Sequence, residues 1–215
     1  MSKPDIDYSR VTVVDHPVVA RDLTILRDKQ TPPQLFRLAL RRIGIILAYH
    51  SLKALPTQEI EVETPIKKAG GHEFATNVVA VPIIRAGLGL VDAVTTFIPE
   101  AQIGHLGMYR DENTHQPVDY YSNLPSGLEK AMVLIVDPML ATGGSACDSI
   151  SFVKEKGAKD IHFMCLISAP EGINRLQREH PEVPIVTAAI DDHLNEQAFI
   201  VPGLGDAGDR YFGTD

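Results

Sequence analysis

Residues 132–145 read MVLIVDPMLATGGS. The first five of them are all apolar and do not alternate with polar residues, which is typical of a strand buried on both faces of a parallel sheet. Small residues and hydroxyls follow, and a helical pattern begins at Ser145. The stretch therefore predicts a strand, a loop and a helix, which is the repeating unit of an α/β protein.

The same alternation of strand and helix continues on both sides of this unit. Similar Val/Ile-rich runs occur at residues 77–84, 161–167 and 183–190. Helical patterns lie between the strands, at residues 88–97, 145–156 and 171–180. We therefore predict an α/β fold with a parallel-sheet core and helices on both faces. Ligands of such a fold bind beyond the carboxyl ends of the strands.

The chain before residue 77 is predicted to form an arm, a helix and one strand. Residues 11–14 are extended within an arm of about 30 residues. Thr31 as N-cap, Pro32 at the first helical position and Gln34 in a capping box predict the start of the helix. Its apolar stripe comprises Phe36, Leu40, Ile43 and Leu47. Residues 59–66 alternate Glu with Ile and Val, which predicts a half-buried strand.

Composition narrows the class of protein. The chain has 215 residues, 44% of them hydrophobic, and shows no repeat or linker, so we expect one domain over residues 1–215. A net charge of −8 argues against a nucleic-acid surface. The polar residues 1–10 do not resemble a signal peptide, and the longest apolar run is too short to span a bilayer. With Cys147 and Cys165 expected as buried, reduced thiols, we predict a cytoplasmic protein without a membrane partner.

The loop after the strand at 132–136 has the features of a phosphate cradle. Asp137 ends the strand, where its carboxylate can accept hydrogen bonds from sugar hydroxyls. Residues 142–145 then supply hydroxyls and glycine backbone at a helix N-terminus, whose free N–H groups and dipole attract phosphate. The loop lacks the Gly-Lys-Ser/Thr end of a Walker motif. An ordinary glycine-containing turn between strand and helix is the alternative.

Two further segments offer cations for an anionic substrate. Residues 82–89 follow a buried strand, and Arg85 presents a forked donor there for phosphate oxygens. A surface arginine at a helix start is the alternative. Residues 108–123 are polar and long enough for a lid or binding flap, with Arg110 at the base as a second candidate.

Residues 203–208 match the G-x-G-x-x-G dinucleotide fingerprint. We reject that interpretation, because no helix can follow properly so near residue 215 and no second strand completes a βαβ unit. A loop rich in Gly and Asp is better suited to wrapping a small planar ligand with backbone groups. The eight histidines lack metal-binding spacing and are expected to be structural or solvated.

Taken together, these segments resemble the type I phosphoribosyltransferase family. Residues 136–145 resemble its phosphoribosyl-diphosphate loop in the form found in the uracil phosphoribosyltransferase subfamily, which has Asp-Pro, here Asp137-Pro138, where relatives have two acids. Further segments resemble that subfamily in the same order, namely residues 82–89, 107–110, 169–172 and 200–210. The resemblance runs from about residue 10 to the end and is weakest at residues 50–76.

The resemblance implies a fold, a reaction and a set of site residues. The fold would be that of the type I enzymes with an N-terminal arm, a flap loop and a base-binding loop at about 198–215. The reaction would join uracil to 5-phosphoribosyl 1-diphosphate, giving UMP and pyrophosphate in pyrimidine salvage. The resemblance assigns the ribose and 5-phosphate to Asp137, Pro138, Met139, Leu140, Ala141, Thr142, Gly143, Gly144 and Ser145. It assigns the diphosphate to Arg85 and Arg110, the sugar side to Asp206, and the base to Ile200, Gly205, Asp206 and Ala207.

The resemblance also implies cofactors and partners. Mg²⁺ would be carried in by the diphosphate with waters, since no carboxylate cluster for a dedicated metal cage is visible. Arg85, Arg110, Asp137 and Asp206 are the candidate catalytic residues, and Asp206 could assist loss of the uracil N1 proton. A homodimer or higher homo-oligomer is expected, and GTP activates some relatives.

Two alternatives remain open. The first is an enzyme of the same fold that uses another base, such as hypoxanthine, orotate or xanthine. The second is a nucleotide-sensing regulator that kept the fold and binds nucleic acid. The acidic composition and the intact Arg85 and Arg110 weigh against the regulator.

Overall fold

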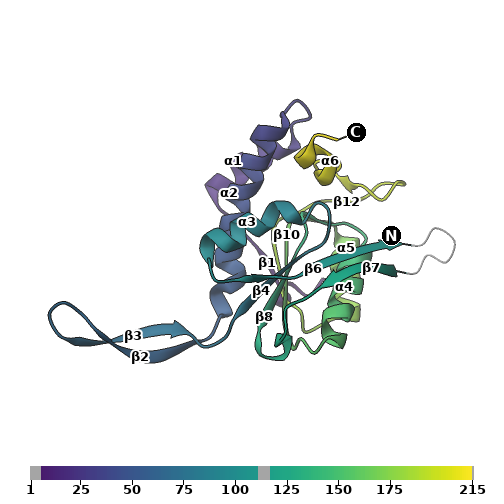
Figure 1. Ribbon diagram of the computed structural model, residues 1–215. Coiled ribbons are helices and arrows are strands. Elements are labelled where there is room, and N and C mark those ends of the chain that lie inside the picture. The colour runs from purple at the N-terminus through teal and green to yellow at the C-terminus, as the bar shows by residue number, and fades with distance from the viewer. Residues whose placement is uncertain (1–5, 111–116, 215) are drawn as a thin grey trace.

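The computed structural model describes residues 6–110 and 117–214, apart from the side chains of residues 108–110 and 117–120. Its centre is a seven-stranded parallel sheet in the order β1-β11-β10-β8-β4-β5, with β9 pairing to β10 (Figure 1). The strands of this sheet are β1 (Val11–Val13), β4 (Val78–Pro82), β5 (Gln102–Ile103), β8 (Met132–Val136), β9 (Met139–Leu140), β10 (Asp160–Ser168) and β11 (Ile185–Ile190).

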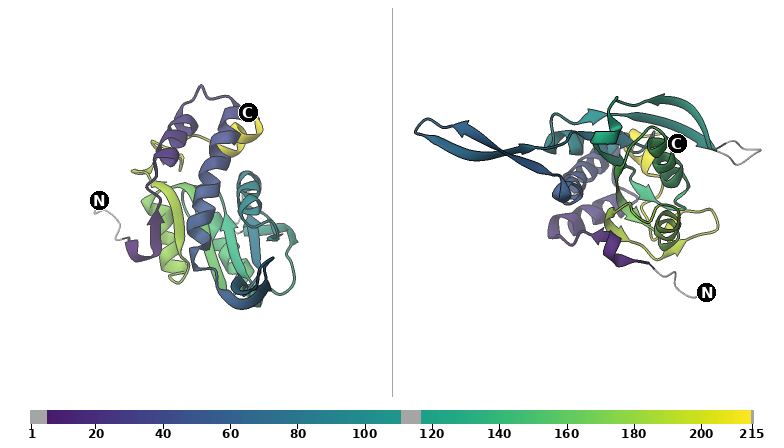
Figure 2. Two further views of the ribbon diagram at one scale, coloured as in Figure 1. Left: turned by 90° about the vertical axis from the view of Figure 1, so that its left-hand side faces the viewer. Right: turned by 90° about the horizontal axis from the view of Figure 1, so that it is seen from below.

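Helices cover both faces of the sheet (Figure 2). One face carries α1 (Pro17–Arg27), α2 (Pro33–Ser51) and α3 (Leu88–Phe97), and the other carries α4 (Gly144–Glu155) and α5 (Pro170–Glu179). Short 3-10 helices lie at Tyr8–Arg10, Leu52–Ala54 and Leu128–Lys130. The predicted parallel-sheet core with helices on both faces is confirmed.

The apolar runs lack alternation because each strand serves two cores. In β8, Leu134 packs into the core under α1, α2 and α3, whereas Val133 and Ile135 pack into the core under α4 and α5. Both cores exclude water, so apolar side chains are required at every position. The strands and helices that were predicted from residue 77 onward agree with the observed ones to within two residues at each end.

The predicted N-terminal helix has the expected apolar stripe but a different start. Its four stripe residues are fully buried, as expected. The helix begins at Pro33 after Pro32, without a side-chain cap. The Thr31 hydroxyl instead donates to the Ile25 carbonyl oxygen, 2.7 Å away at the end of α1. The predicted Thr31 N-cap is therefore wrong, because α1, a helix that the sequence analysis did not predict, provides the acceptor.

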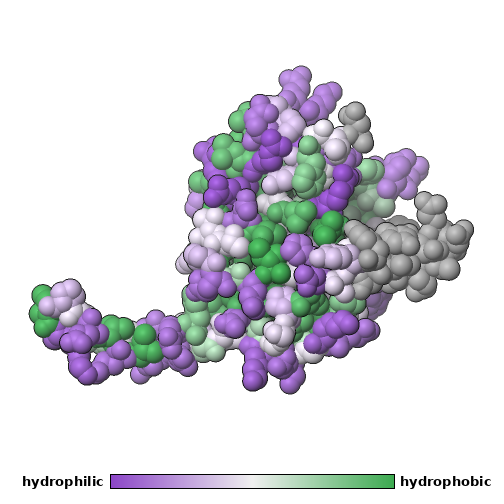
Figure 3. All heavy atoms as spheres, in the orientation of Figure 1, coloured by the Kyte–Doolittle hydropathy of each residue, from purple (hydrophilic) through white to green (hydrophobic). Residues whose placement is uncertain are grey.

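Residues 57–74 form an antiparallel hairpin of β2 (Thr57–Glu63) and β3 (Lys68–Phe74) that projects from the body (Figure 1). Both apolar and polar residues lie on the visible surface of the hairpin (Figure 3). Ile66 at its turn is 91% exposed, and Val62 is also exposed. The prediction of a half-buried strand is therefore wrong: the alternation reflects a strand, but no other element of the described chain covers its apolar face.

The predicted flap is mostly a β-ribbon. β6 (His105–Arg110) and β7 (Pro117–Asn123) pair in antiparallel, and this ribbon projects from the side of the body opposite the hairpin (Figure 2). Residues 111–116 of the predicted flap lie outside the described residues. Both flanks of the predicted flap are therefore paired strands, a feature that was not predicted.

The C-terminal part contains a small hairpin and a helix. β12 (His193–Leu194) pairs with β13 (Ile200–Val201) in antiparallel, and α6 (Ala207–Phe212) packs on α2. The expectation that no helix can follow the glycine motif is wrong, because six residues suffice for α6 once Asp206 caps it. β12 and β13 pair with each other instead of joining the parallel sheet.

Two other expectations concern burial. Cys147 and Cys165 are buried free thiols, as predicted, and burial raises the pKa of each to about 12. No helix within the described ranges has both the length and the apolar character needed to cross a membrane.

Candidate active site

Three segments that were predicted to bind ligand meet at the carboxyl edge of the sheet. The loop after β4 lies beside the end of β8, where the Ile83 N–H donates to the Val136 carbonyl oxygen at 3.0 Å. Asp137 is the first residue after β8. The same loop reaches the C-terminal segment, because Arg85 Nη2 lies 3.1 Å from Asp209 Oδ1 in α6. The edge thus brings together Asp137, Arg85 and the C-terminal loop.

The loop after β8 closes around a small hollow of about 80 Å³, lined by residues 137 and 139–146. This volume equals roughly two to three water molecules. The hollow lies at the N-terminus of α4, where the first N–H groups of a helix have no intrahelical acceptor. Thr142 Oγ1 already accepts from the Gly144 N–H, at 3.4 Å. The arrangement offers backbone donors and a hydroxyl to an anion.

Close packing of α5 holds this loop in place. Gly172 lies in the first turn of α5, and an added Cβ atom would come within 2.4 Å of the Ala141 carbonyl oxygen and 2.7 Å of that of Leu140. The N–H of Ala169, the residue just before α5, donates a hydrogen bond to the Leu140 carbonyl oxygen at 2.9 Å. Residues 169–172, which the sequence singled out only by their resemblance to the family, therefore pack against the backbone of the cradle and support it.

Asp137 has an unusual electrostatic setting. Its backbone N–H donates to the Met164 carbonyl oxygen of β10 at 3.1 Å, which fixes it at the end of β8. The residue is half-buried, and its carboxyl group is surrounded by enough protein to lose most of its hydration. Desolvation raises the pKa of Asp137 to about 7, although a hydrogen bond from the Met139 backbone opposes the shift. Such a carboxyl group gains from any donor or cation brought by a ligand.

Arg85 is held loosely. Its side chain is 58% exposed, and an ion pair of this exposure contributes little free energy. The pKa of Asp209 is lowered mainly by the hydrogen bond from Thr214 and to a smaller extent by the one from Arg85. Arg85 can therefore turn from Asp209 to an anionic ligand at small cost. Arg110 ends β6, which meets the loop after β4 through the Ile83–Leu106 bridge, but its side chain lies outside the described part.

The four predicted base-binding residues lie in one short segment, residues 200–207, which we call the base loop. Ile200 is buried in β13, and the Val201–Pro202 peptide is cis. Asp206 caps α6, with Oδ1 accepting from the Asp209 N–H at 3.0 Å. A carboxylate has two oxygens, so the cap leaves acceptor capacity for a ligand. Ala207 begins α6 with its side chain buried.

Arginines that the sequence analysis missed hold the base loop. Arg210 donates to the Leu204 carbonyl oxygen at 2.8 Å, to that of Asp28 at 2.6 Å, and to that of Leu26. Its guanidinium lies 4.7 Å from the ring centre of Phe36 in α2. Burial lowers the pKa of Arg210. Arg27 of α1 also donates to the loop, at the Gly203 carbonyl oxygen. Apart from Leu204, these partners lie far away in the chain: Leu26 and Asp28 are 184 and 182 residues from Arg210, and Gly203 is 176 residues from Arg27, so no local pattern could reveal them.

Comparison with known proteins gives a consistent result. The family model described as uracil phosphoribosyltransferase matches residues 13–214. A protein of that name from Salinibacter ruber is 54% identical over 204 residues, covering 95% of this chain and 97% of the relative. Another, from Lactiplantibacillus plantarum, is 50% identical over 203 residues, covering 94% and 97%.

Two solved structures have a similar fold. A protein from Aquifex aeolicus is 34% identical with a TM-score of 0.88, covering 94% of this chain and 97% of that one. Adenine phosphoribosyltransferase from Trypanosoma brucei is only 10% identical, with a TM-score of 0.58 and coverage of 86% and 87%. That likeness shows the shared type I phosphoribosyltransferase fold. From the family model and the relatives that match along nearly its whole length, the chain belongs to the uracil phosphoribosyltransferase family.

Proposed function

We propose that the carboxyl edge of the sheet carries out the reaction of this family, in which uracil and 5-phosphoribosyl 1-diphosphate give UMP and pyrophosphate. The observation that carries the proposal is the meeting of three segments at this edge: the hollow at α4, Arg85 and the base loop. Each suits one part of the reactants, namely the phosphoribosyl group, the leaving diphosphate and the base. The activity places the enzyme in pyrimidine salvage.

The phosphoribosyl group is assigned to residues 137–145. The N-terminal N–H groups of α4 and the hydroxyls of Thr142 and Ser145 suit the 5-phosphate. Asp137 accepts hydrogen bonds from the ribose hydroxyls. The protein has already removed most of the water around this carboxyl group, so the ribose hydroxyls provide hydrogen bonds that the group otherwise lacks. The loop therefore fixes the ribose without moving, since Gly172 packs directly behind it.

Arg85 and Arg110 are assigned to the diphosphate. The C1–O bond breaks as C1–N1 forms, so the ribose becomes cation-like and the diphosphate gains negative charge. Forked guanidinium donors stabilise that growing charge more than the ground state. The weak pairing of Arg85 with Asp209 allows it to turn to the diphosphate when the substrate arrives.

Mg²⁺ is the proposed cofactor, carried by the diphosphate. This ion keeps several waters and binds substrate phosphates with one or two protein carboxylates at most. Asp137 and Asp206 provide oxygen acceptors at the edge for such a hydrated ion. When bound, the ion neutralises charge on the leaving group.

The base loop is assigned to uracil. The edge of uracil presents an N3 donor between the O2 and O4 acceptors, and backbone groups at Ile200 and Gly205–Ala207 can match that order. Asp206 then faces the sugar side, where its second oxygen can also take the N1 proton. Such a site needs no polar side chain for recognition, in agreement with the glycine and alanine of the loop.

The decisive experiment incubates the protein with labelled uracil, phosphoribosyl diphosphate and Mg²⁺. We expect labelled UMP, which disappears when EDTA is added. Parallel reactions with hypoxanthine, orotate and xanthine should give no nucleotide, and a product from one of these instead of uracil would contradict the proposed base. Retarded migration of RNA or DNA would support the regulator.

Assembly and regulation complete the proposal. We propose one phosphoribosyltransferase domain over residues 1–215, in a cytoplasmic homodimer or higher homo-oligomer, with GTP as an activator. Light scattering on the protein as it elutes from a size-exclusion column gives its mass and tests the assembly. Initial rates measured at increasing GTP concentration test the activation. A monomeric mass would contradict the first, and a flat titration the second.

A further inference from the structure

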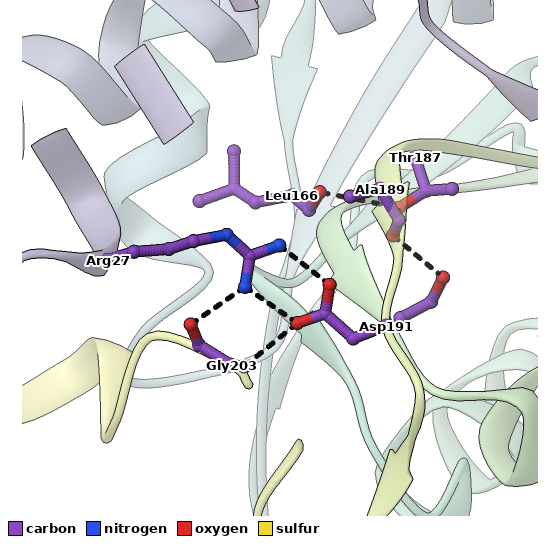
Figure 4. Close-up of polar contacts among 7 residues, drawn as sticks. Arg27, Leu166, Thr187, Ala189, Asp191 and Gly203 are labelled. Atoms are coloured by element: carbon purple, nitrogen blue, oxygen red, sulfur yellow. Dashed lines mark hydrogen bonds and ion pairs between the residues drawn. The ribbon is translucent and has the colours of Figure 1, made fainter. Parts of the chain in front are cut away.

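An ion pair lies directly behind the base loop. Arg27 is the last residue of α1, and Asp191 follows β11. The guanidinium forks onto the carboxylate, with Nη2 at 2.6 Å from Oδ1 and Nη1 at 2.8 Å from Oδ2 (Figure 4). The Asp191 side chain is only 4% exposed and that of Arg27 is 27% exposed. The pair is therefore largely shielded from water.

The pair binds both backbone polar groups of Gly203. The Gly203 N–H donates to Asp191 Oδ2 at 2.9 Å, and its carbonyl oxygen accepts from Arg27 Nη1 at 2.9 Å (Figure 4). Asp191 is itself fixed to the sheet, because its N–H donates to the Ser168 carbonyl oxygen at 2.8 Å. Gly203 is thus held from two sides by groups that do not belong to the base loop.

The position of Gly203 determines the shape of the base loop. Its φ is +63°, and a Cβ atom there would lie 2.1 Å from the Ile200 carbonyl oxygen. The chain therefore folds back tightly between Ile200 and Gly203, and Gly205 follows two residues later. A shift of Gly203 would change the separation between Ile200 and Gly205–Ala207, the two parts assigned to uracil.

We propose that Arg27 and Asp191 are positioning residues for the base, an inference that rests on the proposed function. By holding Gly203, they keep the two parts of the base loop at the separation that the edge of uracil requires. They act through the loop and do not touch the substrate. Their effect falls on the affinity for the base and on the choice between bases, while the phosphoribosyl cradle is unaffected.

The test compares Arg27→Met, Arg27→Lys and Asp191→Asn, with uracil and phosphoribosyl diphosphate varied separately. Misplacing reacting groups by about 1 Å can cost about 100-fold. We expect KM for uracil to rise about 10- to 100-fold in Arg27→Met and Asp191→Asn. KM for phosphoribosyl diphosphate should change little. Lysine should restore uracil binding only in part, because a point charge cannot replace the fork.

Selectivity separates positioning from general stability. We call the Arg27–Asp191 pair, together with its two hydrogen bonds to Gly203, the clamp. If the clamp sets the separation between the two parts of the base loop, the ratio of kcat/KM for uracil to that for cytosine should fall in Arg27→Met. A residue that only stabilises the fold would reduce the amount of active enzyme and leave this ratio and both KM values unchanged. An unchanged uracil KM together with an unchanged ratio would overturn the proposal.

The chain offers a matched control in the pair Arg42–Asp22. It joins α2 to α1 with Nε 2.6 Å from Oδ2 and Nη2 2.9 Å from Oδ1, and the Asp22 side chain is fully buried. Arg42→Met removes the same kind of fork at a comparable depth but away from Gly203. It should lower thermal stability and leave uracil KM unchanged. A rise in uracil KM equal to that of Arg27→Met would also overturn the proposal.

Hydrogen exchange tests the clamp without turnover. Amides of residues 200–207 should exchange faster in Arg27→Lys than in the unaltered protein, and should keep their rates in Arg42→Met. Equal rates in Arg27→Lys and the unaltered protein would contradict the clamp. Failure of the unaltered protein to make UMP would instead contradict the proposed function, so the two failures are distinguishable.

Discussion

Gly172 in α5 lies so close to Ala141 that a Cβ atom added at Gly172 would be only 2.4 Å from the Ala141 carbonyl oxygen. The relationship predicts the outcome of Gly172→Ala. Helix propensity alone favours alanine by about 1 kcal/mol. The added methyl must instead displace the backbone of the cradle, and we expect a net loss of about 1–3 kcal/mol in the free energy of unfolding. Binding of phosphoribosyl diphosphate should weaken as well.

Gly70→Ala is the control for this substitution, because a Cβ atom at Gly70 in the hairpin meets nothing within 4 Å. Denaturant unfolding and calorimetric titration with phosphoribosyl diphosphate should show both losses in Gly172→Ala and neither in Gly70→Ala. A Gly172→Ala protein of equal or higher stability and unchanged affinity would show that α5 does not support the cradle.

Asp137→Asn is predicted to separate activity from stability. One ribose acceptor changes from a carboxylate to an amide, and a hydrogen bond to a charged group contributes about 1.5–3 kcal/mol. Activity should therefore fall about 10- to 100-fold in a protein that remains folded. Near-normal turnover would remove Asp137 from the site.

The same substitution should stabilise the ligand-free protein at alkaline pH. The pKa of Asp137 is raised from 3.8 to about 7, so between these values the folded state keeps a proton that the unfolded state has lost. Stability of the unaltered protein therefore falls as pH rises through this window, whereas asparagine has no such loss. The melting temperature of Asp137→Asn should exceed that of the unaltered protein at pH 8 and approach it near pH 4. Parallel curves would contradict the burial of this charge.

Arg110→Ala should slow turnover and weaken binding of phosphoribosyl diphosphate, because one forked donor to the leaving group is lost. Uracil binding to the enzyme loaded with its other substrate should be less affected. Arg110→Lys should restore activity only partly. Titration calorimetry and initial rates measure both effects, and unchanged values in Arg110→Ala would withdraw the assignment.

Cytosine is predicted to be essentially no substrate, whereas 5-fluorouracil should be accepted. Cytosine has an acceptor at N3 and a donor at position 4, so two backbone groups of the base loop would face like groups. Each unpaired buried polar group costs about 1–3 kcal/mol, and such sites can reject analogues by about 10⁴–10⁵. 5-Fluorouracil keeps the edge of uracil. Comparable kcat/KM for cytosine and uracil would falsify backbone recognition even if the phosphoribosyl chemistry stood.

Gly205→Val should harm uracil binding more than Leu204→Met. The φ of Gly205 is +77°, a region that a β-branched residue adopts only with strain of about 1–3 kcal/mol. Leu204 is buried, and methionine nearly conserves its volume, so little should change. KM for uracil in the two variants measures the difference, and a larger rise for Leu204→Met would show that side chains, not backbone, shape the loop.

The sequence allowed the central sheet and much of the site to be predicted, for identifiable physical reasons. Strands between two cores need apolar residues at every position, so β8 was predicted at its observed bounds. The cradle and Arg85 directly follow such strands, and their place at one edge follows from parallel pairing. The five segments that resemble the subfamily also lie in a fixed order, which made the family recognisable.

Features that depend on distant partners were not predictable. Alternation at residues 59–66 indicated a strand but could not show that the hairpin leaves the body. Thr31 does not cap α2, because its hydroxyl donates to the Ile25 carbonyl oxygen; that partner is only six residues away, but it belongs to the helix α1, which was not predicted. Arg27 and Asp191 are 164 residues apart, and each alone reads as a surface charge. Local patterns carry information on a residue's neighbours along the chain, not on a partner brought close by folding.

The polar contacts that shape the base loop have a consequence for the time course of folding. Arg27 reaches Asp191 across 164 residues, and Arg210 reaches Leu26 across 184. Contacts of such high sequence separation form late, because the entropy of closing the loop is lost before they contribute. During refolding from denaturant, helical circular dichroism should therefore recover before the ability to bind uracil.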